Sequence, residues 1–128
     1  MVQVFWGSHV ADVLTDAGYK VVIYDLKYSP YLREGQEMVV SDILDEDKVN
    51  EVTKGATYVY NFAAIADIEE AAERPLETVK CNILGNAIIL DACVKNNVKR
   101  FIYASSIYVY SDKGSFYRVS KQACELAH

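Results

Sequence analysis

The apolar positions of this chain fall into short continuous runs that alternate with stretches of helical spacing. In residues 9–18, apolar side chains recur at intervals of three and four, and the pattern ends at Gly18, which predicts a helix. Residues 19–26 form a β-branched run that is long enough for a strand and too short for a helix. The same criteria predict further strands at 37–43, 56–64 and 98–106, and further helices at 44–55, 75–97 and 116–128.

The alternation of strands with helices predicts βαβ units and therefore a parallel sheet. The predicted strands are almost continuously apolar, as expected when helices cover both faces of a sheet. We therefore expect residues 1–128 to form one partial α/β domain, a doubly wound and Rossmann-like parallel sheet. Sheets of this kind bind ligands at the carboxyl ends of their strands, so candidate site residues are sought there.

Composition narrows the function classes. The net charge is −5 and no basic stripe occurs, so no nucleic-acid partner is expected. No apolar run approaches the roughly 18 residues of a membrane span, and the first residues lack the pattern of a signal peptide. The three cysteines include no C-x-x-C pair, and no Cys/His cluster indicates a metal site. They are expected to be buried in a reducing compartment, which favours a cytoplasmic location; they are Cys81, Cys93 and Cys124.

Three of the predicted strands end in residues that suit a dinucleotide. Asp25 lies 18 positions after Gly7 and is either an exposed turn residue or an acceptor for an adenosine ribose, which would favour NAD over NADP. Asp42 either caps the next helix or binds an adenine amino group. Ala63 and Ala64 are small enough to let a cofactor approach the backbone, or are simply packed.

The fourth strand ends in Ser105 and Ser106, and Tyr117 and Lys121 follow one helical turn apart. Alone, this Tyr/Lys pair could be two ordinary residues on a helix. A positive charge near a phenol lowers its pKa from the ordinary value of about 10, which would suit proton transfer at neutral pH. The residues at the preceding strand ends are therefore needed to decide whether the pair is catalytic or merely part of a helix.

Together these stretches resemble the extended short-chain dehydrogenase/reductase family, the NAD-dependent sugar epimerases and dehydratases. The matching segments appear in the order of the family and cover nearly the whole chain; they are GSHVADVLTDAGYKVVIYDL, SDILD, VYNFAAIAD, NILGNAIILDACVKNNVKRFIYASS and YRVSK. The resemblance implies that the chain descends from an enzyme that oxidises a hydroxyl of a nucleotide sugar transiently with NAD.

The resemblance also implies roles for individual residues. Tyr117 would be the catalytic acid/base, Lys121 its helper and a ligand of the nicotinamide ribose, and Ser106 the hydroxyl that donates to the substrate, with Ser105 as the alternative. Asn82 would be structural. The residues implied to bind the cofactor are Phe5, Trp6, Gly7, Asp25, Asp42, Ile43, Phe62, Ala63, Ala64 and Lys121.

The ends of the chain depart from the family pattern. If Gly7 is the last glycine of the G-x-x-G-x-x-G turn, Met1 and Val4 occupy the two earlier positions, and the first strand is largely missing. Residues 1–5 would then form a short substitute strand or none, which would leave the neighbouring strands as unpaired edges. The resemblance implies a smaller C-terminal domain that binds the sugar, and we expect residues 1–128 not to include it.

Three functions follow from this pattern. The chain is expected to be the cofactor-binding part of an NAD-dependent nucleotide-sugar epimerase or dehydratase, inactive by itself. The alternative is a binding module without catalysis, which holds NAD or a protein partner. The third is a homo-oligomer in which exposed sheet edges pair with a second copy or another subunit.

Overall fold

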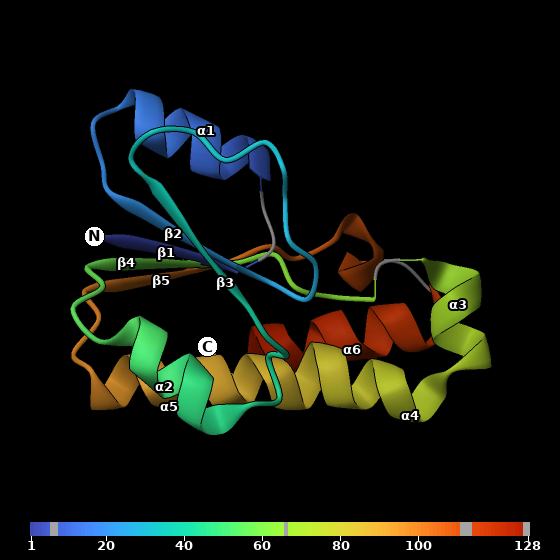
Figure 1. Ribbon diagram of the computed structural model, residues 1–128. Helices are drawn as coiled ribbons and strands as arrows, with labels where there is room; N and C mark the ends of the chain where they lie inside the picture. Colours follow the sequence, from blue (N-terminus) through green and yellow to red (C-terminus); the bar gives the residue numbers. More distant parts are fainter. Residues whose placement is uncertain (6–7, 66, 111–113, 127–128) are drawn as a thin grey trace.

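The computed structural model describes residues 1–5, 8–65, 67–110 and 114–126. They form one parallel sheet of five strands in the order β3-β2-β1-β4-β5 (Figure 1). The strands are β1 (Val2–Phe5), β2 (Val21–Asp25), β3 (Gln36–Val40), β4 (Tyr58–Asn61) and β5 (Arg100–Tyr103). The helices are α1 (Ser8–Asp16), α2 (Glu46–Thr53), α3 (Ile68–Glu73), α4 (Pro75–Thr78), α5 (Gly85–Lys95) and α6 (Ser115–Leu126), with a π-helix η1 (Val79–Leu84) and a 3₁₀-helix η2 (Ile107–Tyr110).

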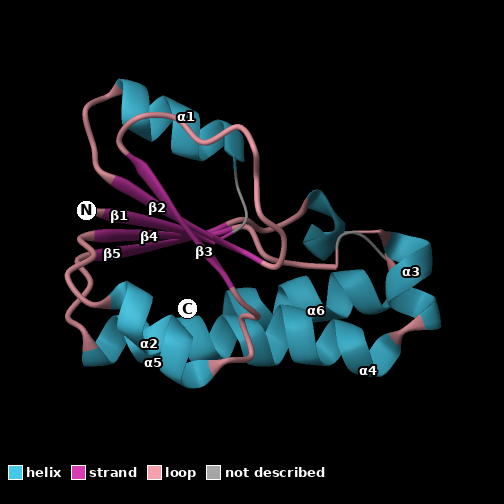
Figure 2. Cartoon of the chain, viewed as in Figure 1, coloured by secondary structure: helices cyan, strands magenta, loops and turns pink. Residues whose placement is uncertain are grey.

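Helices cover both faces of the sheet. Figure 2 shows α1 on one face, together with the loop from β2 to β3, and helices α2 to α6 on the opposite face. Successive strand residues point to opposite faces, so each strand contributes to two cores. The core under α1 contains Val4 and Ile23, and the core under α2 and α5 contains Phe5 and Tyr24. The predicted doubly wound α/β fold is therefore confirmed.

The start of the chain forms a complete central strand. β1 pairs in parallel with β2 from Val2 to Phe5 and, on its other side, with β4. The expectation that β2 and β4 have unpaired edges here is wrong, because four residues are enough to fill the gap between them. Val4 is a fully buried strand residue and does not lie in a glycine turn. Gly7, the residue that set that alignment, lies outside the described residues.

The predicted helix over 75–97 begins at Pro75, in the first turn, where a missing N–H is harmless. It is one helical segment up to Lys95 whose middle, η1, is wound as a π-helix. Such wider turns are frequent at functional sites because they change which side chains share a face. In the described part of the chain, no helix has the length and apolar character needed to cross a membrane.

Candidate cofactor and catalytic site

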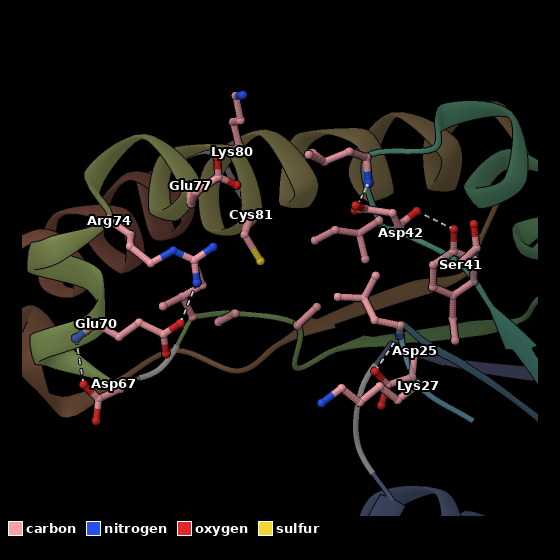
Figure 3. A pocket seen from close by; sticks show the side chains of 17 residues that line it. Asp25, Lys27, Ser41, Asp42, Asp67, Glu70, Arg74, Glu77, Lys80 and Cys81 are labelled. Carbon is pink, nitrogen blue, oxygen red and sulfur yellow. Dashed lines mark hydrogen bonds and ion pairs between the residues drawn. The ribbon is translucent and has the colours of Figure 1, made fainter. Parts of the chain in front are cut away.

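A cavity of about 770 Å³ lies at the carboxyl ends of β2, β3 and β4. This size is within the range of about 300–1,000 Å³ that is usual for small-molecule sites. Figure 3 shows Asp25 and Asp42 on one side of it, and Glu70, Arg74 and Cys81 on the other. Its wall and floor comprise Tyr24, Asp25, Leu26, Lys27, Ser41, Asp42, Ile43, Leu44, Ala63, Ala64, Ile65, Asp67, Glu70, Arg74, Glu77, Lys80 and Cys81.

Asp25 is the last residue of β2 and is half-buried. One carboxylate oxygen accepts the backbone N–H of Leu26 at 2.6 Å, which holds the side chain at the edge of the cavity. A carboxylate can accept about four hydrogen bonds, so it keeps acceptor capacity for the hydroxyls of a ribose. Lys27 lines the same cavity and places a positive charge near this carboxylate (Figure 3).

Asp42 follows β3, and both its carbonyl and its carboxylate accept hydrogen bonds. Its carbonyl accepts the hydroxyl of Tyr24 at 2.6 Å, and its carboxylate accepts the N–H of Leu44 at 2.9 Å. The N-cap of α2 is Asp45, whose side chain accepts the N–H of Lys48. Asp42 therefore closes the turn before the helix rather than capping it. Its side chain lines the cavity, where it could accept an amino group.

Burial raises the pKa of the Tyr24 phenol, so it stays protonated and continues to donate to the carbonyl of Asp42.

The floor of the cavity is made of small residues after β4. Ala63 and Ala64 line it, and the N–H of Ala63 donates to the side chain of Asn61 at 3.0 Å. Asn61 is buried and its amide nitrogen donates to Asn86 at 3.0 Å. This fixes the chain where a ligand would approach the backbone.

The wall opposite Asp25 was not predicted from the sequence. Arg74 lies there in an ion pair with Glu70, at 2.8 Å between Nη1 and Oε1 (Figure 3). Lys80 and Cys81 come from the π-helix η1. The spacing of 70, 74, 77, 80 and 81 is compatible with one helical face, which is the signal that could have grouped them.

Lys121 lies outside this cavity, at the end of β5. Its side chain is buried, with 3% of the residue exposed, and its Nζ donates to the carbonyl of Ala104 at 2.8 Å. Nζ lies 5.7 Å from the centroid of the Tyr117 ring and 4.7 Å from that of Tyr103. Burial lowers the pKa of Lys121. The predicted Tyr/Lys pair therefore does lie on one helix, α6, next to the end of a strand.

The two serines after β5 have different surroundings. The hydroxyl of Ser105 is exposed and donates to the carboxylate of Glu125 at 2.6 Å. Ser106 is half-buried, and its carbonyl accepts the N–H of Val109 at the start of η2. The hydroxyl of Ser105 is thus engaged by α6, the helix that also carries Tyr117 and Lys121.

Asn82 joins three parts of the fold. Its side chain accepts the N–H of Ile65 at 2.7 Å and donates to the carbonyl of Ile65 at 3.1 Å and to the hydroxyl of Ser120 at 3.0 Å. Ser120 in turn donates to the carbonyl of Tyr117 at 2.8 Å. The loop after β4 is thus tied to the helix that carries Tyr117 and Lys121. This placement agrees with the structural role that the resemblance implies for Asn82.

The remaining predicted cofactor residues are placed as follows. Phe5 is fully buried in the core and packs against Tyr24, with ring centroids 5.0 Å apart. Phe62 packs against the core under α1. Trp6 and Gly7 lie outside the described residues. The cavity thus brings together five predicted residues, namely Asp25, Asp42, Ile43, Ala63 and Ala64. In the described ranges, no group of three or more His, Cys, Asp or Glu side chains could hold a metal ion.

A parallel sheet with a cavity at the ends of three strands is the arrangement of a nucleotide-binding α/β domain. The comparisons with known proteins make this specific. The chain belongs to the NAD dependent epimerase/dehydratase family, whose model matches residues 3–126.

The curated relatives of this chain are named for different reactions. The chain is 34% identical over 123 residues to the bifunctional protein GAL10 of Candida maltosa, covering 86% of this chain and 80% of that sequence. It is 31% identical to UDP-N-acetyl-alpha-D-glucosaminuronate decarboxylase of Bacillus cytotoxicus, covering 83% of this chain and 35% of the relative. It is 32% identical to UDP-glucose 4-epimerase of Yersinia pestis, covering 84% and 35%.

Solved structures of epimerases have the same fold as this chain. UDP-glucose 4-epimerase from Brucella ovis in complex with NAD matches with a TM-score of 0.90 and 27% identity, covering 98% of this chain and 46% of that one. UDP-N-acetylglucosamine 4-epimerase from Methanobrevibacter ruminantium, in complex with UDP-N-acetylmuramic acid, matches with a TM-score of 0.88 and 28% identity, covering 98% and 48%. The chain therefore spans less than half of the length of these enzymes.

Proposed function

We propose that this chain is the NAD-binding part of an NAD-dependent nucleotide-sugar epimerase or dehydratase. The observation that carries the proposal is the cavity, which gathers the residues after β2, β3 and β4 that suit the adenosine half of the cofactor. Asp25 would accept the ribose hydroxyls, and Asp42 the adenine amino group. Ala63 and Ala64 would let the cofactor approach the backbone. The relatives catalyse different reactions on UDP-sugars, so the proposal names the class only.

The chemistry would take place beside β5. When bound, NAD would supply a hydride acceptor for a sugar carbon, and the hydroxyl on that carbon would have to lose its proton. Tyr117 would take this proton as its phenolate, and Ser106 would donate to the same sugar oxygen. Lys121 would favour the phenolate through its charge, since an opposite charge within a few ångströms lowers a phenol pKa. The same ammonium would bond the nicotinamide ribose.

The chain by itself is proposed to be inactive, because it spans under half of the two solved epimerases, and the family resemblance implies a sugar-binding domain C-terminal to these residues. Cofactor binding is the property that can be tested directly. Purified chain is titrated with NADH, with excitation of Trp6, the single tryptophan, and detection of nicotinamide emission. We expect saturable energy transfer. Both NAD and AMP should compete with NADH, because the cavity is proposed to bind the adenosine half that all three share.

Matched variants locate the binding. Asp25→Ala removes a carboxylate that lines the cavity and should weaken NADH binding by about tenfold, equivalent to ~1.4 kcal/mol. Glu34→Gln changes an exposed carboxylate in the loop between β2 and β3 and should bind NADH like the parent. Absence of transfer in a chain with a cooperative unfolding transition would reject the proposal. Equal losses in the two variants would place binding elsewhere.

A second candidate function is association with another protein chain. β5 pairs with β4 on one side, and in the described part of the chain no strand pairs with its other side. A free strand edge can be extended by another strand, either from a second copy or from a different subunit. Light scattering after size exclusion tests this: a dimer favours it, and a monomer at every concentration counts against it.

A further inference from the structure

Lys121 lies between two tyrosine rings, and the nearer one is not Tyr117. Its Nζ is 4.7 Å from the centroid of the Tyr103 ring, within the distance of about 6 Å at which an ammonium is attracted to the face of an aromatic ring. The Tyr117 ring lies further away, at 5.7 Å. Tyr103 is the last residue of β5.

The burial of Lys121 creates a requirement that this contact can meet. A buried amine tends to lose its proton because the charged form is poorly solvated, and burial does lower the pKa of Lys121. The proposed role of Lys121 needs the charged form, since only an ammonium favours the phenolate of Tyr117. Some neighbouring group must therefore stabilise the ammonium.

The carboxylate of Glu125, one turn further along α6, accepts the hydroxyl of Ser105. The two thiols that interact with Lys121 do not supply a negative charge near neutral pH. The thiol of Cys124, on α6, and that of Cys81, on η1, would raise the pKa of Lys121 if they were ionised. Burial raises the pKa of both thiols, which keeps them neutral. The Cys124 thiol in fact donates to the carbonyl of Asn82 at 2.9 Å. Burial also raises the pKa of the Tyr103 phenol, so this ring too is neutral.

We propose that the ring of Tyr103 is the cation–π platform that keeps Lys121 protonated and directs its ammonium toward Tyr117. The carbonyl of Ala104, the residue directly after β5, accepts a hydrogen bond from Nζ at 2.8 Å and also holds the ammonium in place. Tyr103 is thus a positioning residue that acts through Lys121. The inference deepens the proposed function, since it rests on the role given there to Lys121.

The test measures the charge of Lys121 directly. Chain labelled with ¹³C at the lysine side chains is titrated by NMR, and the resonance of Lys121 is assigned by its loss in Lys121→Arg. Tyr103→Phe keeps a ring face and should leave the Lys121 pKa nearly unchanged. Tyr103→Leu removes the ring and should lower the pKa by about one pH unit. The other lysines, such as the exposed Lys20, should titrate alike in all samples.

A graded series separates the platform from simple packing. Phenylalanine, 3,5-difluorophenylalanine and 3,4,5-trifluorophenylalanine at position 103 have nearly the same shape and a progressively weaker negative ring face. We expect the pKa of Lys121 to fall in that order, by about one pH unit over the series. The same pKa throughout the series would overturn the proposal. If Tyr103→Leu does not fold, the fluorinated series alone decides.

This measurement uses neither NAD nor a sugar. A flat fluorine series would therefore reject the platform even if NADH binds as proposed. Failure of NADH to bind would reject the proposed function without changing the titration of Lys121. The two failures are thus distinguishable.

Discussion

Ile43 lies directly against Gly85. A Cβ atom at residue 85 would come within 2.3 Å of the Cδ1 of Ile43 and 2.9 Å of its Cγ1. Ile43 follows β3 and lines the cavity, whereas Gly85 begins α5. The absence of a side chain at residue 85 therefore lets the helix approach the loop that carries Asp42 and Ile43.

The substitution Gly85→Ala should destabilise the chain and weaken nucleotide binding. At an unhindered helix position this change stabilises a protein by about 0.5–1 kcal/mol. Here the new methyl group must displace a buried side chain, which costs typically about 1–3 kcal/mol. We expect a net loss of about 1 kcal/mol in the free energy of unfolding, measured with urea, and a rise in the Kd for NADH because Ile43 moves.

The double variant Gly85→Ala/Ile43→Val provides the control. Ile43→Val removes Cδ1, the atom in closest contact, and should alone cost about 1 kcal/mol. In the double variant the alanine methyl has more room, so the two losses should sum to more than the measured loss, with a coupling of at least about 0.5 kcal/mol. Strict additivity would show that the two residues do not constrain each other.

The amide of Asn82 provides a second test of how the site is held. Asn82→Ala leaves both the N–H and the carbonyl of Ile65 without this partner, and also releases the hydroxyl of Ser120. Loss of the partner of a buried polar group costs about 1–3 kcal/mol, so we expect a loss of about 2 kcal/mol in the free energy of unfolding.

The comparison is Asn50→Ala. The side chain of Asn50 accepts one hydrogen bond from Asn96 at 2.9 Å, away from the cavity. This variant should lose less stability and bind NADH like the parent. Equal losses of stability in Asn50→Ala and Asn82→Ala, with NADH binding unchanged in both, would contradict a supporting role for Asn82 at the site.

The contrast between β2 and β1 shows how far local patterns determine the fold. Residues 21–25 were predicted as a strand because a short β-branched run bounded by Gly18 has few alternatives. For residues 2–5 the prediction stayed open between a short substitute strand and none, because the alignment was anchored on glycine spacing, which put Val4 in a turn although V-x-V-F suits a strand. In the structure the pairing partners on both sides determine β1, and these are distant in sequence.

The candidate site also contains residues that could be predicted from the sequence and residues that could not. Asp25, Asp42, Ala63 and Ala64 could be selected because each follows its strand directly, and parallel strands bring their carboxyl ends together. Helical spacing could have grouped Arg74 and Cys81 with each other, but not with the strand ends, because their approach to the cavity depends on the path of α4 and η1. The contact of Lys121 with Tyr103 joins two residues 18 positions apart that no short-range period relates.

Alkaline pH should destabilise the chain through Cys93. This residue is 6% exposed, and burial raises the pKa of its thiol from the ordinary value of 9.0 to about 11. Between these two values the unfolded thiol has released its proton while the folded thiol retains it. Stability therefore falls as pH rises from about 9 to 11, by an amount on the order of 2 kcal/mol from this group.

Because other groups also titrate between pH 9 and 11, the quantity to measure is the difference in unfolding free energy between the parent and Cys93→Ala at each pH. The stability lost in Cys93→Ala should be largest near pH 8 and should shrink by roughly 2 kcal/mol at pH 11, because alanine has no proton to lose. Val94→Ala, at an exposed position of the same helix, should lose the same amount at every pH. A pH-independent difference for Cys93→Ala would refute the assignment.

The choice between NAD and NADP should depend on Asp25 and Lys27, which line the same cavity. The carboxylate of Asp25 would repel the 2′-phosphate of NADP, whereas Lys27 would attract it. Asp25→Asn should therefore move the ratio of the two Kd values toward NADP by about tenfold, equivalent to ~1.4 kcal/mol. Competition of each nucleotide against NADH gives both values. Adding Lys27→Gln to Asp25→Asn should reverse most of the gain, because the remaining attraction is lost. If the ratio is the same in the parent, the single and the double variant, the adenosine ribose does not lie beside Asp25, and the cavity would have to hold the cofactor in another orientation.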